Sequence, residues 1–228
     1  MDQGKSQRKP SIAIMIMITG LFLLVLLACS SLVLYFNYLG FCDKVAGLPL
    51  PPCNFLKTAP ERSFTTRELL INLSEMLPGW TVSDPPQRLI DECNYKDASV
   101  IIFQANTDFP WRRAMQRVYQ YRSASGARPR AKQMYEGCIV PGQFGSTPPE
   151  WTYQSPVADQ SYFACDARQG QPLNCQWSGR YEEYVVVFGS WIIPDRMSLQ
   201  DMERVIRAID MRMAQYLGKP YPDVPARP

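Results

Sequence analysis

The sequence predicts an α+β protein, in which an N-terminal single transmembrane helix precedes one disulfide-braced domain with a mainly antiparallel sheet and about three packed helices. Three observations lead to this fold class. An uncharged apolar run lies near the N-terminus, six of the seven cysteines follow it, and stretches with strand periodicity alternate with stretches of helical periodicity. Helices that pack against an antiparallel sheet are typical of this class.

The apolar run Ile12 to Tyr38 contains no charged residue, and about 20 apolar residues suffice to cross a bilayer as a helix. We expect a transmembrane signal anchor within residues 11–41, with aromatic residues at its C-terminal end. Three basic residues and one acidic residue precede it, whereas the charges just after it are balanced. The positive-inside rule therefore predicts a cytoplasmic tail over residues 1–10 and an extracytoplasmic location for the rest.

Two alternatives to an uncleaved anchor are compatible with parts of this segment. A cleaved signal peptide needs a shorter apolar region that ends at small residues, but here the apolar run continues past Ala28 to Ser31. The run Leu26 to Ser30 resembles a bacterial lipobox, in which Cys29 would carry the lipid. A polar tether normally follows a lipobox, whereas residues 32–41 are still membrane-like. We favour the anchor, and both forms hold the chain at the outer side of the bilayer.

Six cysteines lie beyond the span, and an even number on an oxidising side of a membrane predicts disulfide bonds. Proximity in the sequence favours the pairs Cys42 with Cys53 and Cys165 with Cys175, which leaves Cys93 with Cys138. The competing interpretation is a zinc site. Since the chain has no histidine and no C-x-x-C spacing, we expect no metal.

Proline divides the outer part of the chain. Residues 42–62 hold four prolines, a density that excludes a helix and predicts a stiff stalk. Residues 63–218 are long enough for one α+β domain with its own core. Residues 219–228 hold four more prolines and are expected to form a C-terminal tail.

Three segments of the domain have helical periodicity. The first is Thr66 to Leu77, behind a capping box of Thr65 and Glu68. The second begins after Pro110 and places apolar residues on one side and arginine and glutamine on the other. The third runs from a Ser198 cap to Gly218. Strands are expected at residues 80–83, 98–105, 151–154, 161–166 and 175–193, and loops or turns at residues 84–86, 123–132 and 137–150.

A weak internal repeat accompanies this pattern. In each half a cysteine and an aromatic residue precede an apolar strand, a proline and an amphipathic segment, at residues 93–121 and 175–218. The pattern is compatible with a duplicated strand-and-helix unit and equally with two unrelated units of the same kind.

Catalytic signatures are absent from the sequence. Without histidine the chain lacks the commonest general base and every Ser-His or Cys-His arrangement, and no phosphate-binding glycine loop is present. Paired carboxylates could serve a hydrolase. Glu182 and Glu183 are adjacent on a predicted strand and would point to opposite faces, so only Asp91 with either of them remains as a pair. We therefore expect no enzyme activity and no small-molecule cofactor.

The most distinctive predicted surface is the basic stretch 111–132, which contains no acidic residue. It could bind anionic lipid headgroups, envelope glycan or an acidic protein, although a solvated helix face followed by an arginine-rich loop would give the same pattern. Its candidate binding residues are Trp111, Arg112, Arg113, Arg117, Arg122, Arg128, Arg130 and Lys132.

Charge balance argues against nucleic acid as a partner. The chain has 24 Lys plus Arg and 21 Asp plus Glu, and removal of the three basic residues and one acidic residue of the N-terminal tail leaves 21 against 20. The sequence therefore predicts a membrane-anchored extracytoplasmic binding or accessory module, which is held in the lipid bilayer by its N-terminal helix and docks on another membrane or envelope protein. The alternatives are a binder of envelope glycan or anionic lipid through residues 111–132 and, as the least favoured, a carboxylate-dependent hydrolase.

Overall fold

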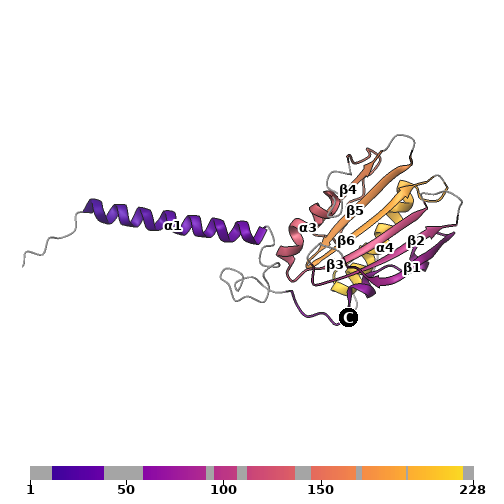
Figure 1. Cartoon of the computed structure of the whole chain (residues 1–228), viewed down its shortest axis with the longest axis horizontal. Helices are drawn as coiled ribbons and strands as arrows, with labels where there is room; N and C mark the ends of the chain where they lie inside the picture. The colour runs from indigo at the N-terminus through magenta and orange to yellow at the C-terminus, as the bar shows by residue number, and fades with distance from the viewer. Residues whose placement is uncertain are drawn as a thin grey trace, which may run out of the picture.

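The structure is a computed structural model that describes residues 12–38, 59–90, 95–106, 112–136, 145–167, 171–193 and 195–222. Helix α1 (Ile12–Tyr38) extends away from a folded domain (Figure 1). The 10-residue N-terminal tail, most of the stalk and the end of the C-terminal tail lie outside the described residues. The described part of the domain is α+β, as the sequence predicts.

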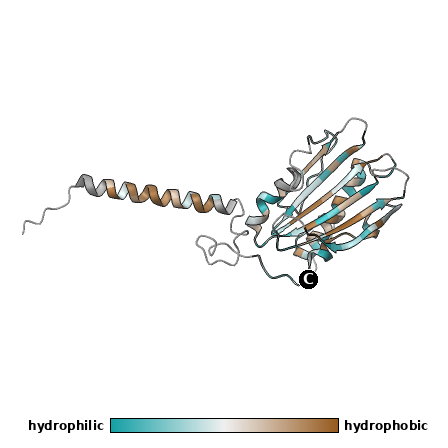
Figure 2. Ribbon diagram, viewed as in Figure 1, coloured by the Kyte–Doolittle hydropathy of each residue, from teal (hydrophilic) through white to brown (hydrophobic). Residues whose placement is uncertain are grey.

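Helix α1 has the length and composition of a membrane span. Its window Met17–Tyr35 has a mean hydropathy of 2.5, and no other helix in the described ranges is both long and apolar enough to cross a bilayer. The helix is apolar on all sides (Figure 2). The hydroxyls of Ser30 and Ser31 donate to the carbonyls of Leu26 and Leu27, so these polar interruptions are satisfied within the helix.

The domain is built on one antiparallel sheet of six strands in the order β1-β2-β3-β6-β5-β4. Two three-stranded meanders are joined through the pairing of β3 with β6. The expected central strand at residues 98–105 is confirmed as β2. The strands are β1 (Trp80–Arg88), β2 (Asp97–Ala105), β3 (Arg113–Gln120), β4 (Gln160–Asp166), β5 (Leu173–Tyr181) and β6 (Tyr184–Ile192).

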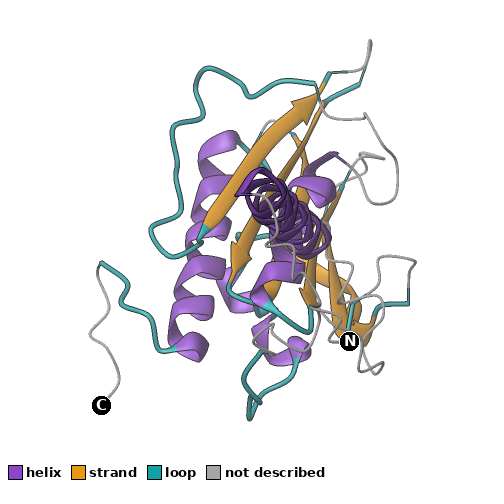
Figure 3. Cartoon of the chain, turned by 90° about the vertical axis from the view of Figure 1, so that its left-hand side faces the viewer, coloured by secondary structure: helices purple, strands orange, loops and turns teal. Residues whose placement is uncertain are grey.

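Helices lie on both faces of the sheet (Figure 3). Helix α4 (Leu199–Leu217) and two 3-10 turns cover the larger core, which includes the fully buried Phe103, Trp177 and Phe188. Helix α3 (Ala124–Glu136) covers a smaller core on the opposite face. The predicted cap of α4 is confirmed, because Ser198 and Asp201 form a capping box and Gly218 ends the helix at a φ of 65°.

The helix expected after Pro110 is wrong, because the segment forms strand β3. The sequence of β3 does not show the alternation of apolar and polar residues that is typical of a strand, because two of the positions that face the core are glutamines. Gln116 is fully buried and its amide oxygen accepts a 2.7 Å hydrogen bond from the backbone N–H of Ile71, while Gln120 donates to the Tyr184 hydroxyl at 3.1 Å. Both polar side chains therefore face the core with partners.

The helix expected over Thr66–Leu77 is replaced by two 3-10 turns, η2 (Thr66–Leu69) and η3 (Leu73–Glu75). The Thr65 and Glu68 capping box is present at the start of η2. Three consecutive apolar residues, Leu69 to Ile71, are all buried, which one face of a helix does not allow. Gln116 bonds the backbone at Leu69 and Ile71 and takes the place of helical hydrogen bonds there.

The expected turn over residues 123–132 is also wrong, because α3 occupies most of it. Ser123 provides the helix start: its hydroxyl accepts a 3.0 Å hydrogen bond from the N–H of Gly126 and its carbonyl accepts one from Ala127. Ala127 and Ala131 then pack against the sheet. Tertiary packing of these alanines offsets the unfavourable Pro129 inside the helix.

Four further expectations differ from the structure. Strand β1 continues through the expected loop at residues 84–86, and residues 151–154 form no strand. Glu182 and Glu183 form a two-residue turn between β5 and β6, in which Glu182 has a φ of 56°. The internal repeat is not a repeated strand-and-helix unit, because α3 and α4 lie on opposite faces and residues 113–120 are a strand.

The predicted Cys165–Cys175 disulfide is confirmed, with Cα atoms 4.0 Å apart on adjacent strands β4 and β5. Both cysteines are buried in the larger core. The bond closes the β4–β5 hairpin. The expected pairs of Cys42 with Cys53 and Cys93 with Cys138 lie outside the described residues, and Cys29 is a free thiol in α1.

Candidate functional site

Strand β4 is one edge of the sheet, and part of its backbone faces outward without a partner. The N–H of Cys165 donates to Ser146 at 2.9 Å and its carbonyl accepts from the same residue, so these groups point away from β5. Backbone direction alternates along an antiparallel strand. The backbone groups of Phe163 and Ser161 therefore also face outward.

The chain begins to pair with this edge and then leaves it. After Ser146, the Thr147 hydroxyl donates to the Phe163 carbonyl at 2.7 Å. Pro148 and Pro149 follow and have no N–H to continue the pairing, and Trp151 N–H bonds back to the Pro148 carbonyl at 3.0 Å. Within the described residues, the Phe163 N–H and both backbone groups of Ser161 have no hydrogen-bond partner. We call these three groups the β4 edge.

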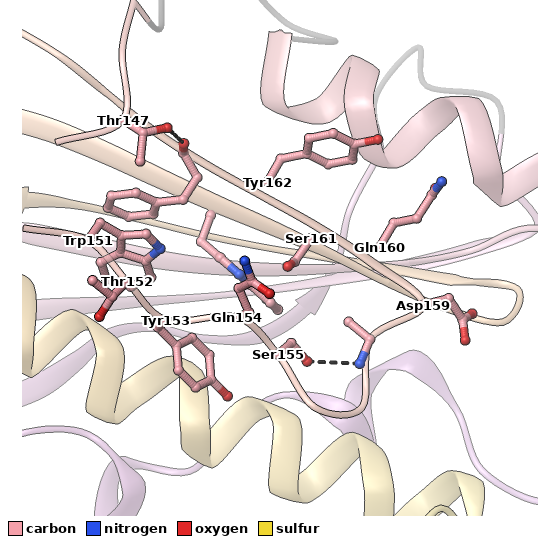
Figure 4. Close-up of a pocket in the computed structure, with 13 residues that line it drawn as sticks. Thr147, Trp151, Thr152, Tyr153, Gln154, Ser155, Asp159, Gln160, Ser161 and Tyr162 are labelled. Atoms are coloured by element: carbon pink, nitrogen blue, oxygen red, sulfur yellow. Dashed lines mark hydrogen bonds between the residues drawn. The ribbon is translucent and has the colours of Figure 1, made fainter. Parts of the chain in front are cut away.

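A hollow of about 540 Å³ lies beside the β4 edge (Figure 4). Ser161 and Tyr162 point to opposite sides of the strand, yet both line the hollow, so it runs along the backbone of β4. The opposite wall is the segment 151–159. The lining residues are Thr147, Trp151, Thr152, Tyr153, Gln154, Ser155, Ala158, Asp159, Gln160, Ser161, Tyr162, Phe163 and Trp177.

Contacts between aromatic rings form the end of the hollow near Trp151. The Trp151 ring stacks on Phe163 with centroids 3.7 Å apart and planes 12° apart, and Tyr153 meets Trp151 edge-on at 6.2 Å. Beneath them the indole of Trp177 lies over Gly179, where a Cβ atom would be 2.4 Å from the ring. Glycine is therefore required at position 179 for Trp177 to take its place.

A buried carboxylate attaches the wall of the hollow to α4. Asp210 is fully buried and accepts hydrogen bonds from three hydroxyls: Ser155 at 2.6 Å, Tyr153 and Tyr181. Ser155 in turn accepts from the backbone N–H of Ala158 at 2.8 Å. The segment 151–159 is thereby fixed to a rigid helix.

Burial changes the acidity of this group of side chains. Desolvation raises the pKa of Asp210, while its hydrogen bonds from Ser155, Tyr153 and Tyr181 act in the opposite direction. Burial and the neighbouring Asp210 raise the pKa of Tyr153 and of Tyr181 well above the ordinary value of 10.0. Both tyrosines are therefore neutral donors at physiological pH.

Asp159 is the one charged side chain among the residues that line the hollow, and it is engaged. It accepts from the backbone N–H of Glu182 at 2.8 Å and lies 3.4 Å from Arg180 and 3.2 Å from Lys219. Other lining groups keep unused hydrogen-bonding capacity. In the described part of the chain, the side chains of Thr152, Gln154 and Ser161 have no hydrogen-bond partner, and the buried amide oxygen of Gln160 has none.

Comparison with known proteins assigns no family. No protein-family model matches the chain, and no curated protein matches it. Among solved structures the chain is similar to the extracellular domain of PknH from Mycobacterium tuberculosis. The two are 13% identical, the match covers 63% of this chain and 93% of that domain, and the TM-score is 0.41. Similarity at this level carries no argument about the ligand or partner of this chain.

The predicted basic stretch 111–132 is distributed over two elements. Arg113 and Arg117 of β3 lie on the face of the sheet that carries α3, because they alternate with the core residues Ala114 and Val118. On α3, Arg128 and Lys132 are exposed and Arg130 is half-buried. Arg112 precedes β3 and Arg122 lies between β3 and α3, while Trp111 is outside the described residues. The role of the basic stretch 111–132 in binding remains a prediction.

The predicted carboxylates form an ion-pair group instead of a cleft. Arg62 donates to Glu183 at 2.9 Å and also binds Glu182, and the Glu183 side chain is 1% exposed. Asp91 lies outside the described residues. The hollow itself was not predicted. Pro148-Pro149 followed by Trp151 and Tyr153 was the available signal, but the sequence does not show that β4 is an edge strand.

Proposed function

We propose that this chain is a membrane-anchored, extracytoplasmic binding module without catalytic activity, which docks on another membrane or envelope protein. Helix α1, with 27 residues and no charge, supports the anchor. The basic N-terminal residues support the outside location of the domain. The Cys165–Cys175 bond supports it as well, because disulfides persist mainly in oxidising compartments.

The observation that carries the proposal is the hollow beside the β4 edge. It combines unused donors and acceptors with aromatic rings, as recognition sites do. Among the described residues that line it, the one carboxylate, Asp159, is held by Arg180 and Lys219, and the chain has no histidine to serve as a general base. These properties favour binding without turnover.

Site-specific photo-crosslinking tests the proposal. The full chain would carry a photoreactive amino acid at Thr152, which is exposed and lines the hollow, or at Arg204, an exposed position on α4 with a side chain 66% accessible. We expect illumination of intact cells to give a discrete protein adduct from position 152 and none from position 204. The absence of an adduct at 152, or the same adducts from both positions, would contradict the proposal.

A second candidate function is binding to an anionic glycan or lipid through the basic face. The observation in its favour is that β3 and α3 present Arg113, Arg117, Arg128 and Lys132 on one face of the sheet. Retention of the detergent-solubilised chain on an immobilised anionic polysaccharide at low salt would test it. The double variant Arg113→Glu/Arg128→Glu should elute earlier than the wild type. Equal retention would remove this candidate.

A further inference from the structure

The two edges of the sheet are protected to different degrees. Edge strand β1 contains Pro85 and Pro86, and its register with β2 shifts between Val82 and Asp84 and again between Asp84 and Gln87. Prolines and bulges of this kind prevent another strand from pairing. Edge strand β4 contains no proline, and its register with β5 is regular over all seven residues. Of the two edges, β4 has the geometry that another strand can extend.

The chain itself protects only one end of β4. Ser146 pairs with Cys165 and Thr147 caps the Phe163 carbonyl, after which Pro148 and Pro149 turn the chain away. The next positions along the edge are the Phe163 N–H and the N–H and carbonyl of Ser161. They are separated by two residues, which is the spacing at which an extended chain places its own donors and acceptors.

We propose that an extended segment of the partner protein adds to the sheet beside Ser161 to Phe163 and continues the line that residues 145–147 begin. The inference rests on the proposed function and specifies how the partner is bound. One residue of the added segment would exchange two hydrogen bonds with Ser161, and a residue two positions away would accept from the Phe163 N–H. Main-chain bonds of this kind supply affinity, and alternate side chains supply specificity.

The chemistry of the hollow defines the side chains of that segment. Gln154, Ser161 and Thr152 offer amide and hydroxyl groups, and Trp151 and Tyr153 offer aromatic rings (Figure 4). The one charged lining residue, Asp159, is already paired. A charged side chain placed in the hollow would lose hydration without gaining a counter-charge. The segment is therefore uncharged at the positions that face the hollow.

A peptide experiment on the full chain in lipid nanodiscs tests the inference. The probe is a library of capped, uncharged pentapeptides, and the tightest member is then methylated at one backbone nitrogen at a time. Strand addition predicts an alternating pattern, since only every second N–H faces β4. We expect at least a tenfold loss of affinity for methylation at those positions and less than a twofold change at the others.

Protein variants provide a second measurement. The N–H of Ser161 takes no part in pairing with β5, so Ser161→Pro removes a donor from the β4 edge and leaves the ladder bonds in place. It should weaken the peptide at least tenfold. The matched control is Ser83→Pro on the β1 edge, which should leave binding unchanged. If Ser161→Pro does not fold, the methylation series on the wild-type chain decides.

Four outcomes would overturn the inference. The first two are that no library member binds at millimolar peptide and that methylation causes equal losses of affinity at every position. The third is that a neutral oligosaccharide such as maltopentaose binds and displaces the peptide. The fourth is that the chain forms a dimer which Ser161→Pro dissociates.

If crosslinks form from position 152 in cells while the peptides fail to bind, strand addition is wrong and the proposed function stands. If peptides bind but no crosslink forms in cells, the mode of binding stands and docking on a membrane partner is wrong.

Discussion

The Ser155 hydroxyl donates a 2.6 Å hydrogen bond to Oδ1 of the buried Asp210, and this contact joins the wall of the hollow to helix α4. Tyr153 and Tyr181 donate to the same carboxylate. One side chain on α4 thereby positions the segment that faces the β4 edge. The site depends on a contact between residues 55 positions apart in the sequence.

Asp210→Ala should destabilise the domain by about 1–3 kcal/mol, because the two buried tyrosine hydroxyls and the half-buried Ser155 hydroxyl lose their common acceptor. It should also speed amide hydrogen exchange in residues 151–159. Chemical denaturation and exchange mass spectrometry of the full chain in detergent would measure both. Glu203→Ala is the control, since the exposed Glu203–Arg207 pair on the same helix contributes less than about 1 kcal/mol. Equal effects of the two substitutions would contradict the assigned role of Asp210.

Asp210 should also give the domain a specific pH dependence. Its pKa in the folded domain lies above the ordinary 3.8, chiefly because of burial. A carboxyl group whose pKa is higher in the folded than in the unfolded state contributes to the unfolding free energy. This contribution is fully present below the pKa of the unfolded state and is lost as the pH rises through the pKa of the folded state. The unfolding free energy of the wild type minus that of Asp210→Asn should therefore increase as the pH is lowered from neutral through the raised pKa. A difference that is constant with pH would show that Asp210 does not titrate in this way.

Arg62→Ala should lower the unfolding free energy by about 1–3 kcal/mol. It leaves Glu183, which is 1% exposed, as a buried carboxylate without its cation. The double variant Arg62→Ala/Glu183→Gln should be more stable than Arg62→Ala alone, because a neutral amide is easier to bury than an unpaired carboxylate. Arg204→Ala removes the exposed pair with Asp201 and serves as the control, with an expected change below about 0.5 kcal/mol. Urea denaturation would compare the three variants.

Gly179→Ala should destabilise the domain by about 1–3 kcal/mol, because the new methyl group would overlap the Trp177 ring. Displacement of Trp177 should also change the hollow and weaken peptide binding. Gly145→Ala is the matched control, since no atom lies within 4 Å of a Cβ built there. Thermal unfolding of both variants would measure the difference, and a Gly179→Ala domain as stable as the control would contradict the packing described for Trp177.

Loss of the Cys165–Cys175 bond should lower the unfolding free energy by about 2–3 kcal/mol, the chain-entropy value for a short loop. The double variant Cys165→Ala/Cys175→Ala avoids thiol exchange with the other cysteines. Since this bond and the β4 edge share one strand, we expect faster amide exchange at Ser161 and Phe163 as well. Unchanged stability would mean that the β4–β5 hairpin is held by its ladder alone.

Parts of the fold that depend on local patterns were predicted correctly from the sequence. The charge-free run gives α1, the Ser198 and Asp201 capping box gives the start of α4, and short spacing gives the Cys165–Cys175 pair. These features involve residues that are close along the chain. Strand β2 was predicted as well, since a run apolar on both faces is typical of a strand covered on both sides.

Features that depend on distant contacts were not predicted. Gln116 is a polar residue that the sequence places on the outside of a helix. In the structure it is buried, because its amide bonds the backbone at Leu69 and Ile71 and joins β3 to the segment 66–77. The β4 edge could not be inferred from the sequence either. Its prediction requires the strand order of the whole sheet and the point at which Pro148 and Pro149 turn the chain away from β4.

Amide hydrogen exchange at Ser161 and Phe163 is the most direct test that a partner occupies the β4 edge. The exchange rates would be compared between the full chain in membrane vesicles from the cells that make it and the same chain purified in detergent. The account predicts that both amides exchange at least tenfold more slowly in the vesicles, with Ser83 on the β1 edge unchanged. Equal rates at Ser161 and Phe163 in the two preparations would contradict it.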